Sequence, residues 1–125
     1  MAAIVEIITE WPDPALNPNR RLGKHWGSTY RAKETARQAA MLMACKWRDV
    51  FPPDVSLVAV ITLEPPDSRR RDVDNVLAAL KPTLDGIAAG CNFDDSRIWK
   101  HVIQRREPHP PAGRVTISLH LDLEY

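Results

Sequence analysis

The stretch VSLVAVITL, residues 55–63, decides the fold of this chain. It is a nearly continuous run of apolar residues, rich in valine. Such a run is typical of a central strand that is covered on both faces. A strand buried in this way needs layers of other elements around it. We therefore expect a single domain, residues 1–125, built on a sheet with residues 55–63 in its middle.

The segments on either side show the periodicities of further strands and helices. β-branched or alternating residues predict three more strands, over residues 3–9, 97–106 and 114–124. Apolar residues at helical spacing predict two helices, over residues 29–49 and 74–89. The order β-α-β-α-β-β predicts an α+β fold (α/β layers), with a mixed sheet and helices packed on one face.

Local features refine this prediction. Pro82 lies inside the second helix and is expected to bend it, and Gly90 is expected to end it. The loop at residues 107–113 joins the last two strands, which fits an antiparallel pair. In residues 114–124 the alternation predicts that Val115, Ile117, Leu119, Leu121 and Leu123 point inward and that the residues between them, His120 included, point outward.

Composition excludes several classes of protein. The first residues carry acids and no basic segment, which argues against a secretory signal, and no apolar run approaches the roughly 20 residues of a membrane span. Cys45 and Cys91 show no metal-ligand spacing, so reduced, buried thiols are expected. The histidines form no motif and are expected on the surface or in packing: His25, His101, His109 and His120. We expect a soluble protein of the cytoplasm.

Basic residues are distributed unevenly although the formal net charge is only +1. Residues 19–48 contain a single acid, Glu34, and residues 69–71 are all arginine. The basic residues of the first segment are Arg20, Arg21, Lys24, Arg31, Lys33, Arg37, Lys46 and Arg48. Such clusters fit a nucleic-acid-binding face and also fit a solvated helix surface. Composition alone favours the second interpretation.

The segment at residues 11–28 is rich in proline, asparagine and glycine, which predicts a long loop. Long loops in small domains are commonly functional or mobile. Trp11 and Trp26 lie in it among basic residues. They fit stacking on exposed bases and, more commonly, packing against the core.

The sequence RRRDVDN, residues 69–75, places Asp72 and Asp74 at the start of the second helix. If the connector is extended, the two carboxylates lie on one side, because alternate residues share a face. Two such ligands can hold Mg²⁺ or Mn²⁺, with water and substrate phosphate completing the shell. An aspartate near a helix start also caps free N–H groups and suits the helix dipole. Two interpretations therefore fit this segment. The aspartates cap the helix and form salt bridges, or they form a metal site beside a phosphate-binding edge.

A second acidic pair, Asp94 and Asp95, follows the same helix. The helix would carry the chain about 24 Å away from Asp72. These acids can therefore approach Asp72 only if the following segment returns, if the helix is kinked or if a second subunit supplies them. A turn role before Ser96 is the alternative.

Together these segments resemble the RusA family of Holliday junction resolvases, in the form found in phages and prophages. The resemblance rests on RRRDVDNV (69–76), LKPTLDG (80–86) and DDSRI (94–98), with weaker support from NPNRR (17–21) and the closing strand. It implies a RusA-like fold and a structure-specific endodeoxyribonuclease that cuts branched DNA in recombination and repair. A related protein that binds branched DNA without cutting is the alternative.

The resemblance also implies site residues. Asp72, Asp74 and Asp95 would hold Mg²⁺, or Mn²⁺, with Asp94 assisting, and a helical lysine is needed for cleavage. The usual lysine follows the second aspartate by four residues, where this chain has Ala78. Lys81 follows by seven residues, and the two offsets lie within about 60° of each other on a helix. Lys81 is therefore the candidate catalytic lysine.

The implied substrate is a four-way DNA junction in the nucleoid, and the implied assembly is a homodimer with two matching sites. Cations next to the carboxylates would grip phosphates without reading sequence. The candidates for DNA binding are Arg69, Arg70, Arg71, Arg20, Arg21 and Lys24.

Overall fold

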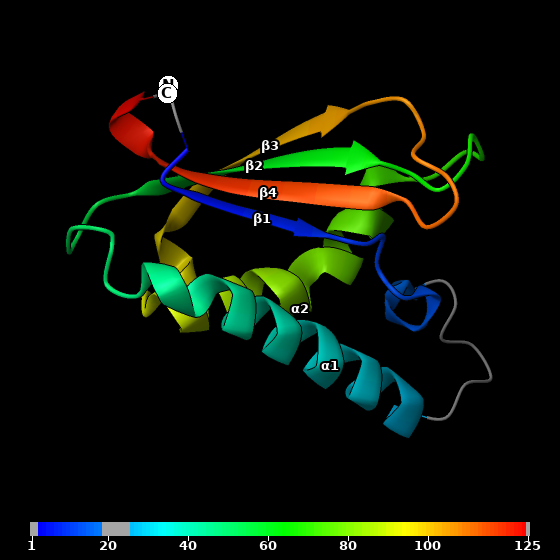
Figure 1. The fold of residues 1–125 in the computed structure, drawn as a ribbon, viewed down its shortest axis with the longest axis horizontal. Coiled ribbons are helices and arrows are strands. Elements are labelled where there is room, and N and C mark those ends of the chain that lie inside the picture. The colour runs from blue at the N-terminus through cyan, green and yellow to red at the C-terminus, as the bar shows by residue number, and fades with distance from the viewer. Residues whose placement is uncertain (1–2, 19–25, 125) are drawn as a thin grey trace.

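A four-stranded mixed sheet forms one layer, and two long helices cover one of its faces (Figure 1). The computed structural model describes residues 3–18 and 26–124. The strands are β1 (Val5–Thr9), β2 (Leu57–Glu64), β3 (Ile98–Arg105) and β4 (Arg114–Leu121), and the helices are α1 (Trp26–Ala44) and α2 (Val73–Cys91). Short 3-10 turns are η1 (Pro14–Leu16), η3 (Cys45–Trp47), η4 (Asp95–Arg97) and η5 (Asp122–Glu124). The expected α+β class is confirmed.

Strand β2 lies inside the sheet, between β4 and β3. It pairs antiparallel with β4 and parallel with β3. All residues from Leu57 to Ile61 are buried, which confirms the central strand predicted from the apolar run. Ile61 belongs to the same core as Leu80 and Ile87 of α2 and Ile117 of β4. No helix in residues 3–18 and 26–124 is long and apolar enough to cross a membrane.

The expected antiparallel pairing of the last two strands is wrong. The strand order is β1-β4-β2-β3, so β4 lies on the far side of β2 from β3. The β2-α2-β3 segment is a helical crossover, which returns the chain beside β2 and parallel to it. The following loop then passes the end of β2, where Arg106 donates its N–H to the Leu63 carbonyl at 2.9 Å and His109 donates to Pro65 at 2.8 Å.

Helix α2 continues through Pro82 and ends at Cys91, so the predicted end at Gly90 is wrong. Asn92 ends the helix in the left-handed conformation, with φ 62° and ψ 50°. Gly90 instead lies against α1, where a Cβ would approach the Met41 carbonyl oxygen to 2.6 Å and the Ala44 Cβ to 2.9 Å. The missing side chain lets the two helices pack closely.

Strand β4 ends at Leu121, earlier than predicted. Its buried Val115, Ile117 and Leu119 confirm the inward positions there, but Leu123 is 79% exposed and its predicted inward orientation is wrong. The chain leaves the sheet at Asp122, which donates its N–H to the Ser56 carbonyl at 2.9 Å, so the alternation no longer applies. His120, predicted to point outward, is buried.

The two cysteines differ in exposure. Cys91 is buried as expected, and burial raises the pKa of its thiol to about 11. Cys45 is exposed in η3, so the prediction of a buried thiol is wrong there. The Cys45 thiol donates to the Leu42 carbonyl at 3.1 Å.

Candidate functional site

Candidate residues predicted from the sequence line two of the cavities beside α2, on different sides of its first turns. The first has a volume of about 420 Å³, and we call it the carboxylate cavity. It is lined by Asp74, Leu77, Ala78, Lys81, Leu84, Asp95, Ile98 and His101. The second has a volume of about 570 Å³, and we call it the arginine cavity. It is lined by Trp11, Pro12, Asp13, Pro14, Asn17, Pro66, Arg69, Arg70, Arg71, Asp72, Asn75, Val76 and Ala79.

Helical spacing explains which residues reach the carboxylate cavity. Asp74, Ala78 and Lys81 lie four and three residues apart, which places them on one side of α2. The chain returns after α2 through η4 and β3, which supply Asp95 and His101. The structure thus brings together Asp74, Lys81 and Asp95 within one chain.

Lys81 carries the positive charge of this cavity. Its Nζ donates to Asp85 Oδ1 at 2.8 Å and to Asp95 Oδ2 at 2.7 Å. The hydrogen bond to Asp85, followed by that to Asp95, raises the pKa of Lys81. The hydrogen bond from Lys81 lowers the pKa of Asp95. Lys81 therefore stays charged and Asp95 stays ionised at neutral pH.

Asp72 lies on the arginine cavity, apart from the other candidate ligands. It is the N-cap residue of α2, but its side chain makes no capping hydrogen bond. The helix begins at Val73, so Asp74 lies one residue inside it. Residues two apart in a helix are about 200° apart around the axis, whereas an extended connector would have placed both on one side. In residues 3–18 and 26–124, no three or more His, Cys, Asp or Glu side chains are grouped to hold a metal ion.

Asp94 serves the local turn. It is the N-cap residue of η4, and its Oδ1 accepts the backbone N–H of Ser96 at 2.9 Å. This is the turn role that the sequence left open. Asp95, the next residue, is free of that role and points its carboxylate to Lys81.

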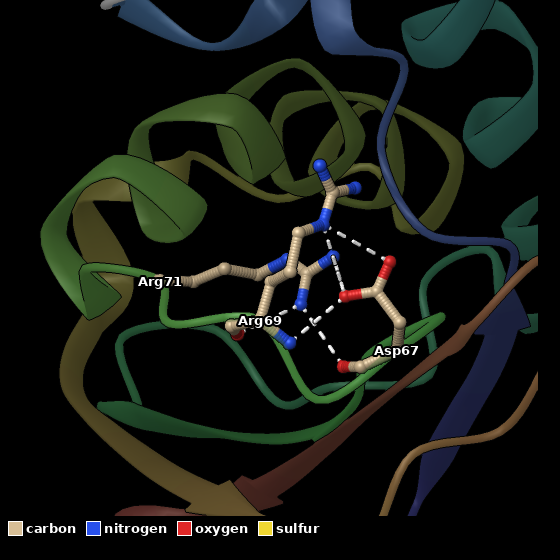
Figure 2. Close-up of polar contacts among 3 residues, drawn as sticks. All are labelled: Asp67, Arg69 and Arg71. Atoms are coloured by element: carbon tan, nitrogen blue, oxygen red, sulfur yellow. Dashed lines mark hydrogen bonds and ion pairs between the residues drawn. The ribbon is translucent and has the colours of Figure 1, made fainter.

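Asp67 organises two of the three consecutive arginines (Figure 2). The Nε of Arg69 lies 3.2 Å from both carboxylate oxygens of Asp67, and its backbone N–H lies 2.9 Å from Oδ1. Arg71 reaches the same Oδ1 at 2.9 Å and donates to the carbonyl of Asp67 at 3.0 Å. These bonds, the one from the Arg69 side chain first, lower the pKa of Asp67 to about 2.

The remaining cations differ from this pair. Arg70 is exposed and has no hydrogen-bond or ion-pair partner among the residues that the structure describes. Arg20, Arg21 and Lys24, predicted to bind DNA, lie outside the described residues. The DNA-binding role of all these side chains stays a prediction.

Trp11 packs partly against the hydrophobic core, which confirms the structural interpretation of this side chain. The guanidinium of Arg71 lies 5.4 Å from the centre of its ring. Trp11 therefore joins the N-terminal segment to the arginine-rich connector before α2. The side chain of Trp26 lies outside the described part of the chain.

No protein-family model matches the chain. A protein of Xylella fastidiosa (strain Temecula1 / ATCC 700964), described only as "Uncharacterized protein", is 36% identical over 112 residues. The match spans 87% of this chain and 71% of the Xylella protein. This chain belongs to the family of that Xylella protein. The description of the Xylella protein states no activity, so the proposal for the function rests on the geometry above.

Three residues near these cavities were given no role from the sequence: Asp67, Asp85 and His101. Asp85 lies four residues after Lys81 in α2, a spacing that is readable as a helical ion pair. His101 becomes a candidate only because β3 borders the carboxylate cavity. His101 is exposed, as expected, and borders the cavity without a hydrogen-bond partner among the described residues. Asp67 precedes the arginine run by two residues, and that spacing was the available signal for its role.

Proposed function

We propose that this chain is a metal-dependent, structure-specific endodeoxyribonuclease of the RusA type. It would resolve four-way DNA junctions by paired phosphodiester hydrolysis. The observation that supports this is the meeting of Asp74, Lys81 and Asp95 in one cavity, from the first turn of α2, the middle of α2 and the η4 turn that follows it. Two carboxylates and an ammonium group in one cavity are suited to hydrolysis of a phosphate diester.

Mg²⁺ is the proposed cofactor, with Mn²⁺ as the alternative. Mg²⁺ is usually held by one or two carboxylates together with water and substrate phosphates. Asp74 and Asp95 supply two carboxylates, and the Asp74 side chain has no hydrogen-bond partner among the described residues. A bound ion would lower the pKa of its water and neutralise the scissile phosphate. Asp72 lies on the neighbouring cavity, so its role as a third ligand needs a separate test.

Lys81 would stabilise the negative charge that develops on the phosphate. An ammonium group has three N–H donors, and two of them are directed to Asp85 and Asp95. The third remains for a phosphate oxygen or for the leaving oxygen. Its raised pKa keeps the donor protonated throughout the physiological range.

Arg69, Arg70 and Arg71 would bind phosphates beside the site and position the DNA without reading its sequence. A four-way junction is two-fold symmetric, and its resolution takes two cuts on opposing strands. A homodimer with two-fold symmetry would present two matching sites to it. Branched DNA and a second copy of the chain are therefore the proposed partners.

A nicking assay on synthetic four-way junctions tests the proposal. Wild-type protein should cut with Mg²⁺ or Mn²⁺ and not with EDTA. Asp74→Asn and Asp95→Asn should lose cutting and keep junction binding, and Lys81→Ala should cut about 10²–10³-fold more slowly. Asp54→Asn, in an exposed turn with φ 63°, is the matched control, because asparagine tolerates that backbone conformation.

The Asp72→Asn variant is tested in the same nicking assay. Loss of cutting equal to that of Asp74→Asn would support its role as a ligand, and unchanged cutting would remove it from the site. Normal cutting by Asp74→Asn would reject the metal assignment altogether.

A second candidate function is binding of branched DNA without cleavage. The observation that favours it is the ammonium group of Lys81, which already neutralises the Asp95 carboxylate at 2.7 Å. In that case gel-shift assays would show junction binding by wild-type protein, while neither ion would produce a nick.

A further inference from the structure

Part of the lining of the arginine cavity consists of guanidinium groups with unused donors. Asp67 holds Arg69 through Nε and the backbone N–H. Figure 2 shows the two terminal nitrogens of Arg69 on the side of the guanidinium turned away from Asp67. These nitrogens have no partner among the described residues, and neither does Arg70. A guanidinium fixed at one edge and free at the other is prepared to bind a phosphate with two parallel hydrogen bonds.

Other residues of the same lining carry no charge. Trp11, Pro12 and Pro14 contribute apolar surface, and Asn75 of α2 contributes a side-chain amide. The Asn75 amide has no hydrogen-bond partner among the described residues, so both its donors and its acceptor are available. The volume of about 570 Å³ lies within the range of small-molecule sites.

Charge decides which part of a nucleotide could enter. The exposed Asp72 carboxylate is part of the lining and makes no capping bond to α2. An ionised carboxylate there repels a phosphate, but it can accept a hydrogen bond from the amino or imino group of a base. A phosphate is therefore favoured beside the arginines, and a neutral base is favoured beside Asp72.

We propose that the arginine cavity binds one unstacked nucleotide of DNA, with its phosphate on Arg69 and Arg70 and its base against Trp11 and Asn75. A base inside a duplex is paired and stacked and cannot enter a cavity, whereas a base in a single strand or at a branch point can. The inference deepens the proposed function, and it rests on that function for the choice of DNA as the ligand.

Binding in the presence of EDTA tests the inference without any cleavage. The probes are a short single-stranded oligodeoxynucleotide with 2-aminopurine at one position and the same strand with an abasic site there. Wild-type protein should bind the base-containing strand about tenfold more tightly, because stacking and hydrogen bonds to one base are lost with the abasic strand. The 2-aminopurine fluorescence should also change on binding. Equal affinity for both strands would overturn the inference.

Two variants separate the phosphate contact from the base contact. Arg70→Ala should weaken binding of both strands by a similar factor, because both keep their phosphates. Asn75→Ala should weaken only the base-containing strand and so reduce its preference over the abasic one. Arg48→Ala, an exposed arginine at the end of η3, should change neither affinity. An Asn75→Ala protein with the full wild-type preference would overturn the proposed base contact.

The outcomes also separate this inference from the proposed nuclease. Junction cleavage together with equal binding of both strands would support the nuclease and reject the nucleotide site. Preferential binding of the base-containing strand without cleavage in either ion would support the nucleotide site and reject the nuclease.

Discussion

Lys81 and Asp95 form an ion pair across the carboxylate cavity, with Nζ 2.7 Å from Oδ2. The two residues are 14 positions apart, in α2 and in η4. Asp85 lies 2.8 Å from the same Nζ, so one ammonium group holds two carboxylates. This contact connects the η4 turn, which precedes β3, to the middle of α2, and it fixes the position of the Lys81 ammonium group in the proposed reaction centre.

Replacing Lys81 by methionine should raise the pKa of Asp95 toward its ordinary value, because the hydrogen bond from Lys81 is the main cause of the lowered pKa. Carboxyl-carbon NMR titration of both proteins measures the change. Lys33→Met, an exposed lysine of α1, should leave the Asp95 titration unchanged. An unaltered Asp95 pKa in the Lys81 variant would contradict the ion pair.

The Lys81–Asp95 ion pair also predicts how the stability of the protein changes with pH. The pKa of Asp95 is lowered, so its share of the stability is present above the ordinary carboxyl pKa of 3.8 and is lost as the pH falls through the lowered value. The pKa of Lys81 is raised, so its share is present below 10.5 and is lost as the pH rises through the raised value. Unfolding midpoints in urea should therefore differ between wild type and Lys81→Met at neutral pH and converge at both extremes.

Asp67→Asn should release Arg69 and Arg71 and lower the stability of the connector before α2. The pKa of Asp67 is lowered from 3.8 to about 2 by the Arg69 side chain and then by its backbone N–H. The stabilisation is therefore complete above pH 3.8 and disappears as the pH falls toward 2. Urea unfolding of wild type and variant over this range measures it. A stability difference that persists unchanged at the lowest pH would argue against the clamp.

The two thiols should react at different rates in the native protein. Cys45 is exposed, whereas Cys91 is buried and its pKa is raised to about 11. Reaction with a thiolate-directed reagent should therefore modify Cys45 first, and Cys91 only after unfolding. Peptide mass spectrometry identifies the modified residue, and the Cys45→Ser protein provides the control for the slow phase. Early modification of Cys91 would contradict its burial.

Gly86→Ala should destabilise the protein although alanine is the better helix former by about 1 kcal/mol. The added Cβ would lie 2.9 Å from the Ala40 Cβ and would also meet the backbone of Arg37, so α1 would have to move. Overpacking of this kind costs about 1–3 kcal/mol, measured by urea unfolding. Lys33→Ala, on the exposed side of α1, should change the free energy of unfolding by less than about 0.5 kcal/mol. A stabilised Gly86→Ala protein would show that the helices are not in close contact there.

The sequence predicted the elements better than their pairing. The apolar run at 55–63 leaves few alternatives to a central strand, and helical spacing places Lys81 on the side of α2 that carries Asp74. The antiparallel pair of β3 and β4 was wrong because strand order depends on the crossover through α2, which no local pattern records.

The candidate site was predicted in part for a similar physical reason. Whether Asp72 and Asp74 share a side depends on where the helix begins, and a start at Val73 separates them. The spatial contact of Asp95 with Lys81 depends on the return of the chain after Asn92, which spacing alone left open. Asp67 was missed because its effect comes from side-chain hydrogen bonds within an irregular connector.

Strand β4 comes last in sequence among the strands of residues 3–18 and 26–124, and it lies between β1 and β2. During synthesis, β1 therefore remains without a neighbour until residues 114–121 have left the ribosome, and the helices have no complete sheet to cover before then. Long-range pairing of this kind slows folding, because an extended loop must close before any contact is gained. Closure of the sheet thus depends on residues 114–121, which join β1 to β2.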